Sequence, residues 1–177
     1  MLRHRGPAVC VAAALLAATG PASAQVASLE SVQSARGVKQ AFILIKPEKP
    51  VAAVILFAGG HGHLGLKSAS SMAWGAQNFL VRTRDKFAAQ GLMVAVVDAP
   101  SDHKSARGMN AVFRMSKGHA TDIQAVVDRL KKEANVPVWL VGTSMGTFSA
   151  AGGGIELRNL GGIVLTSTIT RSKPNWN

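Results

Sequence analysis

The residues whose type and spacing point most clearly to chemistry lie at positions 142–146, where the order is Gly-Thr-Ser-Met-Gly. This Gly-x-Ser-x-Gly pattern follows an apolar run at 138–141 and precedes small residues that suit a helix. A serine on a tight turn between a strand and a helix has a strained backbone, and the flanking glycines let strand and helix approach closely. Such a turn presents the Ser144 hydroxyl at the carboxyl edge of a sheet, near the positive end of the helix dipole. The pattern therefore predicts a nucleophile.

The elements that must position this serine are indicated by alternating apolar runs and helical patterns. Continuous apolar runs are typical of strands buried on both faces of a parallel sheet covered by helices, and strand–helix–strand order implies right-handed crossovers. The expected fold class is therefore α/β, a three-layer sandwich with a mostly parallel sheet, in one domain. Strands are expected at 26–34, 38–45, 51–57, 92–97, 136–141 and 162–165, and helices at 76–90 and, from the capping-box spacing that starts at Thr121, at 121–134.

Residues 1–24 have the order of a secretory signal peptide. Two arginines precede an apolar run at 8–18, and the small-residue pattern Ala-Ser-Ala ends at position 24. The run is shorter than the ~20 residues that a membrane-spanning helix needs. The sequence thus predicts an exported protein, periplasmic or secreted, with a mature domain at 25–177. The single cysteine, Cys10, lies in the leader, so the mature chain would have no disulfide and no cysteine-bound metal.

Composition and charge narrow the function classes. Of the 177 residues, 47% are hydrophobic and 16% are charged, a balance that favours a buried core over disorder. The formal net charge is +11. The cations, Arg114 among them, are scattered in runs of no more than two, without the interleaved aromatic residues of a strand-binding groove. We therefore expect a solvated basic surface and no specific nucleic-acid partner.

The serine turn, a glycine-rich turn after an earlier apolar strand, and the strand–helix order together make residues 38–170 resemble the α/β-hydrolase family. Within that family, small exported hydrolases of the dienelactone-hydrolase and lipase-like type are the most similar. The resemblance implies a Ser–His–acid enzyme that needs no cofactor and acts on an ester or related acyl bond of a small-molecule or lipid-like substrate. Ser144 matches the nucleophile and the backbone N–H of Met145 matches one oxyanion donor. The N–H of Gly60 or His61 matches the second donor.

The resemblance also implies an acid and then a histidine after the nucleophile. Beyond Ser144 the sequence has one carboxylate, Glu156, and no histidine. The strand at 162–165 would be the sixth of the family's usual eight. We therefore interpret the chain as a hydrolase domain cut short after its sixth strand, with impaired activity as written.

Upstream residues offer alternatives. A rearranged relay would use Ser144, His61 and Asp102, because a triad is defined by geometry and not by chain order. A metal-dependent hydrolase would instead use His61 and His63 with carboxylates or a histidine from 98–103. A third alternative is a binding protein that keeps a hydrolase-like cleft without catalysis.

Two further residues are assigned to the substrate pocket. His63 follows His61 in the glycine-rich turn, and Trp74 lies in the loop before the next expected helix. Both are expected to line the rim and contact substrate. No metal and no cofactor is expected, and the identity of the substrate and the oligomeric state are left open.

Overall fold

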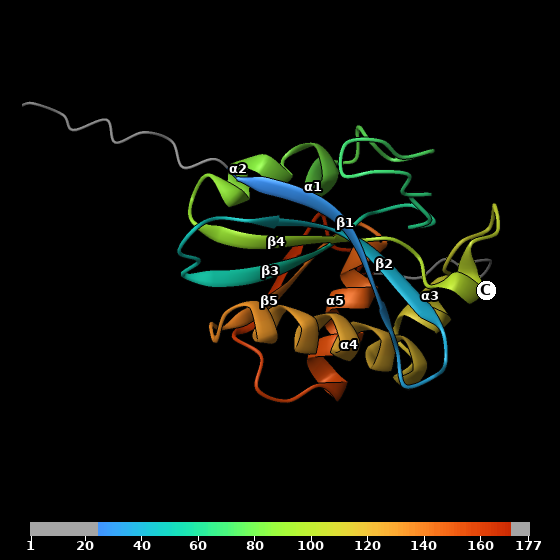
Figure 1. Cartoon of the computed structure of the whole chain (residues 1–177). Coiled ribbons are helices and arrows are strands. Elements are labelled where there is room, and N and C mark those ends of the chain that lie inside the picture. The colour runs from blue at the N-terminus through green and yellow to red at the C-terminus, as the bar shows by residue number, and fades with distance from the viewer. Residues whose placement is uncertain (1–24, 171–177) are drawn as a thin grey trace, which may run out of the picture.

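The computed structural model describes residues 25–170, so the expected signal peptide at 1–24 lies outside the described residues. In this range one sheet has the strand order β1-β2-β4-β3-β5-β6 (Figure 1). The strands are β1 (Val26–Gln33), β2 (Lys39–Lys46), β3 (Ala52–Phe57), β4 (Leu92–Val97), β5 (Val138–Thr143) and β6 (Gly162–Thr166). The helices are α1 (Phe79–Arg82), α2 (Arg84–Ala88), α3 (Ala111–Arg114), α4 (Lys117–Glu133), α5 (Gly146–Glu156) and the short 3-10 helix η1 (Ser101–His103).

The sheet is mostly parallel, which confirms the expected fold class. β4, β3, β5 and β6 are parallel neighbours, whereas β1 and β2 form an antiparallel hairpin that joins the sheet through an antiparallel β2–β4 pair. β3 lies at the centre of the parallel part, between β4 and β5. The carboxyl ends of these strands therefore meet at one edge of the sheet, where α/β folds place their ligands.

Helices cover both faces of the sheet (Figure 1). α4 and α5 pack on one face, where Ile123, Val126 and Leu130 of α4 join one apolar cluster with residues of the central strands. α1 and α2 pack on the other face, where Leu80 and Ala88 join a second cluster. Because each central strand contributes to both clusters, its apolar residues run without alternation, as in other doubly covered sheets.

The helix expected at 76–90 is wrong in extent, because the structure has two short helices there. α1 ends at Arg82 and α2 begins at Arg84. The hydroxyl of Thr83, between them, donates to the carbonyl oxygen of Phe79 at 2.7 Å. Such a side-chain bond back to the preceding turn competes with helix continuation, so the chain bends at a residue that the periodicity placed inside one helix.

The expected start of the next helix is also wrong. α4 begins four residues before Thr121, and its cap is Ser116, whose side chain accepts from the backbone N–H of His119 at 3.2 Å. His119 therefore lies in the first turn of α4 and is buried. Thr121 is an interior residue whose hydroxyl donates to the Lys117 carbonyl. The first turn carries few apolar residues, so hydrophobic spacing does not reveal it.

The last strand differs from the others in its exposure. In the described residues β6 pairs only with β5, and its side chains Ile163, Val164 and Leu165 are 41, 41 and 38% exposed. Val164 also lines an apolar groove of about 370 Å³ with Phe79 and Trp139. β6 thus has the apolar sequence of an interior strand at an edge of the sheet.

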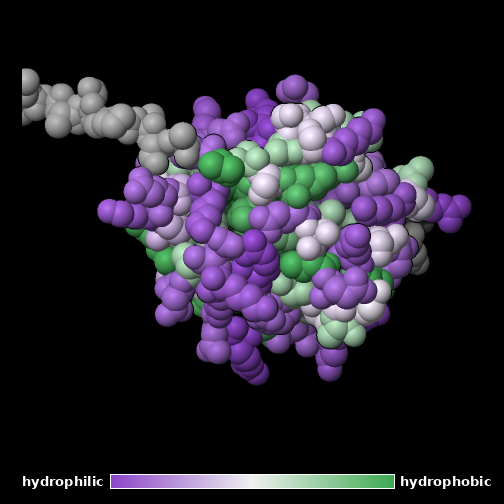
Figure 2. Space-filling view, in the orientation of Figure 1, coloured by the Kyte–Doolittle hydropathy of each residue, from purple (hydrophilic) through white to green (hydrophobic). Residues whose placement is uncertain are grey.

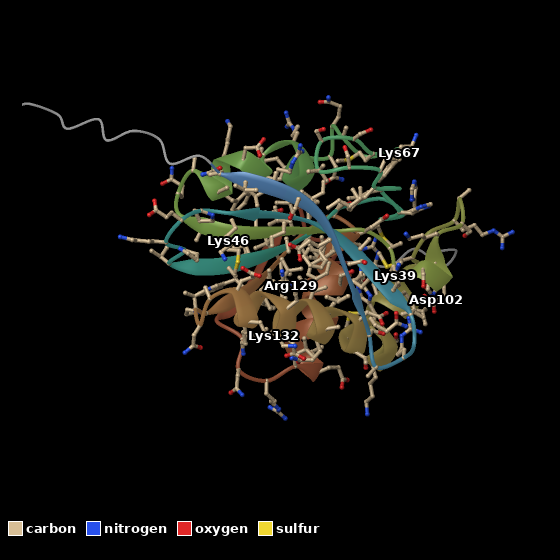
Figure 3. All side chains as sticks on the ribbon, viewed as in Figure 1. Lys39, Lys46, Lys67, Asp102, Arg129 and Lys132 are labelled. Atoms are coloured by element: carbon tan, nitrogen blue, oxygen red, sulfur yellow. The ribbon has the colours of Figure 1, made fainter. Side chains whose placement is uncertain are left out.

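The charged side chains are spread over the surface. The side chains labelled in Figure 3 come from β2, a loop, η1 and α4, and they do not gather at one place. Several are in ion pairs, such as Lys46 with Glu133 and Arg129 with Glu30. Figure 2 shows this face as mostly hydrophilic, with smaller hydrophobic areas near its middle. Within the part of the chain that the structure describes, no helix has the length and apolarity of a membrane span.

The double burial of β3 gives a stability prediction. Ile55 is completely buried in the central strand, so Ile55→Ala should lower the free energy of unfolding by about 2–5 kcal/mol, the usual cost of such a truncation in a packed core. Val26→Ala, at a strand position that is 70% exposed, is the matched control and should change it by less than about 0.5 kcal/mol. Urea unfolding measures both, and equal effects would contradict the described burial.

Candidate active site

Ser144 occupies the sharp turn between β5 and α5. Its φ of 51° lies in the left-handed region that side chains rarely adopt. The turn is held on both sides, because the Ser144 N–H donates to the Thr166 carbonyl of β6 at 3.1 Å and the Ser144 carbonyl accepts from the N–H and the hydroxyl of Thr147. The strained turn expected from the sequence is therefore present, and it half-exposes Ser144 at the carboxyl edge of the sheet.

The two glycines that flank this serine have no room for a side chain. A Cβ on Gly142 would overlap the carbonyl oxygen of Gly146, and a Cβ on Gly146 would overlap the carbonyl oxygen of Phe57, at the end of β3. The N-terminus of α5 consequently lies directly against the backbone of two strands. This contact aims the start of the helix, with its positive dipole end, at the position of Ser144.

The glycine-rich turn after β3 faces the serine. A Cβ on Gly59 would lie 3.2 Å from the Cβ of Ser144 and 3.2 Å from the carbonyl oxygen of Thr143. Within residues 25–170, the N–H groups of Gly60, His61 and Met145 donate to no protein acceptor. These groups adjoin an open hollow of about 570 Å³, which is lined by Gly60, His61, Arg107, Met109, Asn110, Ser144, Met145 and Ile169.

His61 lies in this hollow, but its ring is engaged elsewhere. Its Nδ1 accepts from the backbone N–H of His63 at 3.1 Å, and its ring packs on Trp74 with 4.0 Å between the ring centroids. Burial, and then electrostatic interactions with His63 and Arg114, lower the pKa of His61 below its ordinary value of 6.5. At neutral pH His61 is therefore mainly uncharged, as a base would need to be.

The residues assigned to the substrate pocket lie behind His61 and not in the hollow itself. Trp74 supports the His61 ring and fills the space beside Gly60, whose Cβ would lie 2.7 Å from the indole. The Nδ1 of His63 lies 3.3 Å from the Ser105 carbonyl, on the far side of the turn. Neither side chain lines the hollow beside Ser144.

The carboxylates considered for an acid role are occupied by other partners. The Asp98 side chain accepts from the backbone N–H groups of Leu64, Gly65, Leu66 and Ala99 at 2.6–3.2 Å, so it holds the loop after the glycine-rich turn. The structure therefore gives it a structural duty that the sequence did not indicate.

Asp102 is paired with Arg36, whose guanidinium also binds the buried Asp122. Burial acts to raise the pKa of Asp102, but hydrogen bonds and charge from Arg36 outweigh it and lower that pKa. Among the described residues, no hydrogen bond joins the Ser144 hydroxyl to a histidine, and none joins His61 to Asp102. The structure does not assemble the rearranged relay.

The metal alternative lacks a ligand set. Across residues 25–170, no group of three or more histidine, aspartate or glutamate side chains is arranged to hold a metal ion. His61 and His63 are close, with 6.4 Å between their ring centroids. However, the Asp98 carboxylate, one of those considered with them, accepts from four backbone N–H groups.

The comparisons with known proteins agree with this geometry. No family model and no curated protein matches the chain. Among solved structures, an esterase of Pyrococcus furiosus is 19% identical with a TM-score of 0.60, covering 81% of this chain and 50% of that chain. A cold-adapted esterase from an Arctic intertidal metagenomic library is 18% identical with a TM-score of 0.56, covering 77 and 58%. Brefeldin A esterase, a bacterial homologue of human hormone sensitive lipase, is 18% identical with a TM-score of 0.55, covering 87 and 42%.

The chain has the α/β-hydrolase fold. It spans about half the length of the solved structures that it matches. At this level of identity the likeness concerns the backbone path. Chemical roles for individual residues must therefore be argued from the site of this chain.

Several residues of the hollow were not found by sequence reasoning. Arg107, Met109 and Asn110 come from the connection between β4 and α4, and Ile169 follows β6. The connection after β4 starts at the carboxyl edge of the sheet, where the α/β-hydrolase fold places its site. The start of this connection at the carboxyl edge was therefore the one signal in the sequence that could have pointed to these residues. Arg114, at the end of the same connection, was expected on the solvated surface but is buried, so that expectation is wrong.

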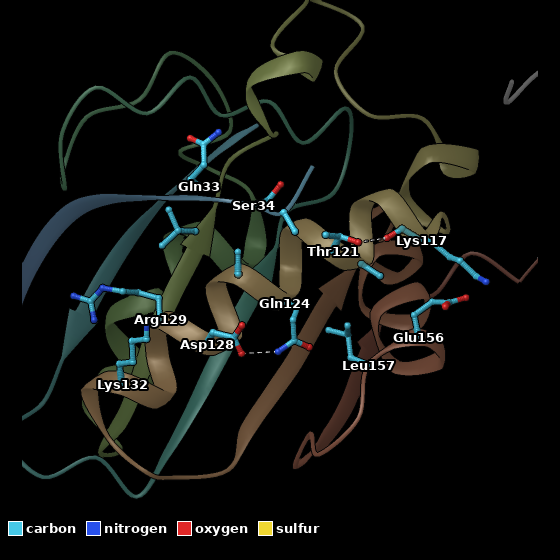
Figure 4. Close-up of a pocket in the computed structure, with 14 residues that line it drawn as sticks. Gln33, Ser34, Lys117, Thr121, Gln124, Asp128, Arg129, Lys132, Glu156 and Leu157 are labelled. Atoms are coloured by element: carbon cyan, nitrogen blue, oxygen red, sulfur yellow. Dashed lines mark hydrogen bonds between the residues drawn. The ribbon is translucent and has the colours of Figure 1, made fainter. Parts of the chain in front are cut away.

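A larger hollow exists elsewhere on the α/β-hydrolase domain. Its volume is about 830 Å³, and it lies between the end of β1 and the helices α4 and α5 (Figure 4). Its lining mixes apolar side chains such as Leu157 with polar ones such as Gln124 and Asp128, which are hydrogen-bonded to each other at 2.6 Å. It includes neither the Ser144 turn nor a glycine-rich turn, so it lacks the features of a nucleophilic site.

The glycine contacts of the turn give a prediction on stability. Gly146→Ala should lower the free energy of unfolding by about 1–3 kcal/mol or more, because the new methyl group overlaps backbone that cannot move independently. Gly154→Ala, in the same helix, is the control. Its Cβ would meet only the Ile163 side chain, and alanine favours a helix by up to ~1 kcal/mol. Thermal unfolding compares them, and a Gly146→Ala protein as stable as Gly154→Ala would contradict the contact.

His119 gives a prediction on pH dependence. Burial, and then the charge of Arg114, lower its pKa from 6.5 to about 3. The unfolded chain therefore takes up a proton near pH 6.5 that the folded chain resists, and stability falls as the pH drops from there toward 3. The loss through this one residue should approach ~1.4 kcal/mol per pH unit. Urea unfolding at a series of pH values should show a shallower loss for His119→Gln, and identical slopes would refute the prediction.

Proposed function

We propose that this chain is the nucleophile-bearing domain of an exported serine hydrolase that cleaves an ester or related acyl bond. The observation that carries the proposal is the position of Ser144. It stands on a strained turn at the start of α5, beside a hollow where the backbone N–H groups of Gly60, His61 and Met145 donate to no protein acceptor within residues 25–170. Export rests on the leader-like sequence of residues 1–24.

The geometry supports the following chemistry. The Ser144 oxygen attacks the acyl carbon, and the carbonyl electrons move onto the acyl oxygen. The N–H of Met145 and an N–H of the Gly60–His61 turn then bind the resulting oxyanion. A preorganised donor of this kind is typically worth about 3 kcal/mol of transition-state stabilisation. Collapse of this intermediate expels the alkoxide, which takes up the proton lost by Ser144 and leaves as the alcohol. Water then hydrolyses the acyl-serine to the acid and regenerates the Ser144 hydroxyl.

Proton transfer is the weak step of the described site. A serine hydroxyl becomes a good nucleophile when a base takes its proton, and among residues 25–170 no histidine is hydrogen-bonded to Ser144. We therefore expect the 177-residue chain to acylate slowly. A serine hydrolase without its triad keeps part of its rate enhancement through substrate binding and the oxyanion hole.

The lining of the hollow indicates a small substrate of mixed polarity. Met109, Met145 and Ile169 offer apolar contacts for an acyl chain, whereas Asn110 and Arg107 offer polar ones at the rim. The solved structures with similar backbones include several named as esterases. A short-chain acyl ester is the substrate class that fits both observations.

A fluorophosphonate probe tests the proposal directly. Such a probe phosphonylates an activated serine and needs the same oxyanion contacts as an ester. Incubation of the purified chain should label Ser144, identified by peptide mass spectrometry, at a rate that exceeds labelling of the heat-unfolded chain.

Two variants make the test specific. Ser144→Ala should abolish labelling. Ser31→Ala, which removes an exposed hydroxyl on β1, should leave the labelling of Ser144 unchanged. A folded chain that takes up no probe would overturn the proposal and favour a binding protein with a hydrolase-like cleft.

A further inference from the structure

Arg114 is a buried cation next to the candidate site. Only 1% of its surface is exposed. Its guanidinium donates to three neutral oxygens, the Gly60 carbonyl at 3.1 Å, the Ser149 hydroxyl at 2.9 Å and the Met109 carbonyl at 3.3 Å. Within the described part of the chain no carboxylate pairs with it. A buried charge without a counter-ion is costly, so its place calls for an explanation.

The three acceptors belong to the three segments that enclose the hollow. Gly60 lies in the turn after β3, Met109 lies in the connection after β4, and Ser149 lies in the first turns of α5, close behind Met145. Arg114 is thus hydrogen-bonded to all three segments at once. The Met109 N–H also donates to the His61 carbonyl at 2.9 Å, which closes the link between two of them.

Two glycines make space for this residue, Gly62 for its side chain and Gly152 for its main chain. A Cβ on Gly62 would overlap the Nη2 of Arg114 and would lie 2.8 Å from the end of Met109. A Cβ on Gly152, in α5, would lie 2.7 Å from the Arg114 carbonyl oxygen. Two glycines from different elements thus admit Arg114, so it is a fixed part of the arrangement and not a surface residue that has folded inward.

The charge on Arg114 persists at neutral pH. Burial lowers its pKa to about 10, which still leaves the guanidinium protonated. The Ser149 hydroxyl accepts from Arg114 and also lies 3.0 Å from the Nε2 of His119. Burial, and then the charge of Arg114, lower the pKa of His119 to about 3, so His119 is neutral at neutral pH. The positive charge behind the turn is therefore not cancelled by these neighbours.

We propose that Arg114 is the positioning residue of the oxyanion hole: it holds the Gly60–His61 turn at a fixed place relative to the start of α5, and it puts a positive charge behind that turn. This inference rests on the proposed role of Ser144. Arg114 does not touch the substrate. It acts through the backbone N–H groups, which are effective only when both point at the same oxygen.

The kinetic test separates bond formation from binding. With the fluorophosphonate probe, Arg114→Met should lower the maximal rate of phosphonylation at Ser144 by about 10-fold or more, since one misplaced donor costs up to ~10²–10³-fold. The probe concentration at half-maximal rate should change little. Arg114→Lys, which keeps the charge, should recover part of the rate. Loss of folded protein alone would lower the labelled fraction and not the rate constant.

Matched variants guard against a simple folding defect. Arg129→Met removes an arginine of α4 that pairs with Glu30 of β1 and with Glu133 of α4. This variant should leave the rate unchanged. Ser149→Ala removes one anchor of Arg114 and keeps its charge, so the rate should fall by a few fold even if Arg114→Met does not fold. Unchanged rates in all folded variants at positions 114 and 149 would overturn the inference.

A second readout does not depend on labelling. Hydrogen exchange followed by NMR should show faster exchange of the Met109 amide, which donates to His61, in Ser149→Ala and Arg114→Met but not in Arg129→Met. If the parent chain takes up no probe, the proposed function fails and this exchange still decides whether Arg114 holds the turn. Equal exchange in all variants would then refute the positioning role.

Discussion

The close contact of backbones at the serine turn is the constraint on which the rest of the structure depends. Because Gly142 and Gly146 carry no side chain, α5 begins directly against the ends of β5 and β3. This contact sets the φ of Ser144, the direction of α5 and the distance to the turn after β3. The sheet order, with β3 beside β5, brings the two turns together in the first place.

Polar groups buried near the site do structural work that their types alone do not reveal. Asp98 follows a buried strand, which is a common place for a catalytic acid, yet it binds four backbone N–H groups. Arg114 resembles any surface cation in sequence, yet it joins three segments. In both cases most of the partners are main-chain groups that folding brings near. Buried main-chain N–H and C=O groups need hydrogen-bond partners, and which of them lie near Asp98 or Arg114 is known only once the chain has folded.

The strands and the serine turn could be predicted because their signals are local. A continuous apolar run bounded by turn residues marks each central strand to within about two residues, and the Gly-x-Ser-x-Gly pattern marks the turn. The helix limits depended on single side-chain bonds, those of Thr83 and Ser116, and were missed. The lining residues Met109 and Asn110 lie in an irregular connection whose path depends on Gly108 packing against His61. No periodicity encodes such a path, so that part of the site required the fold.

The exposed last strand has a consequence for the behaviour of this chain in solution. β6 carries no charge and no proline and offers apolar side chains on both faces, and its edge away from β5 pairs with no other strand among residues 25–170. Edges of that kind accept any extended segment that comes close, including the same edge of another molecule. Long-range repulsion from the net charge of +11 opposes such encounters, and salt screens it over about 10 Å at ordinary ionic strength. Higher ionic strength and higher protein concentration should therefore both favour association of the chain through β6.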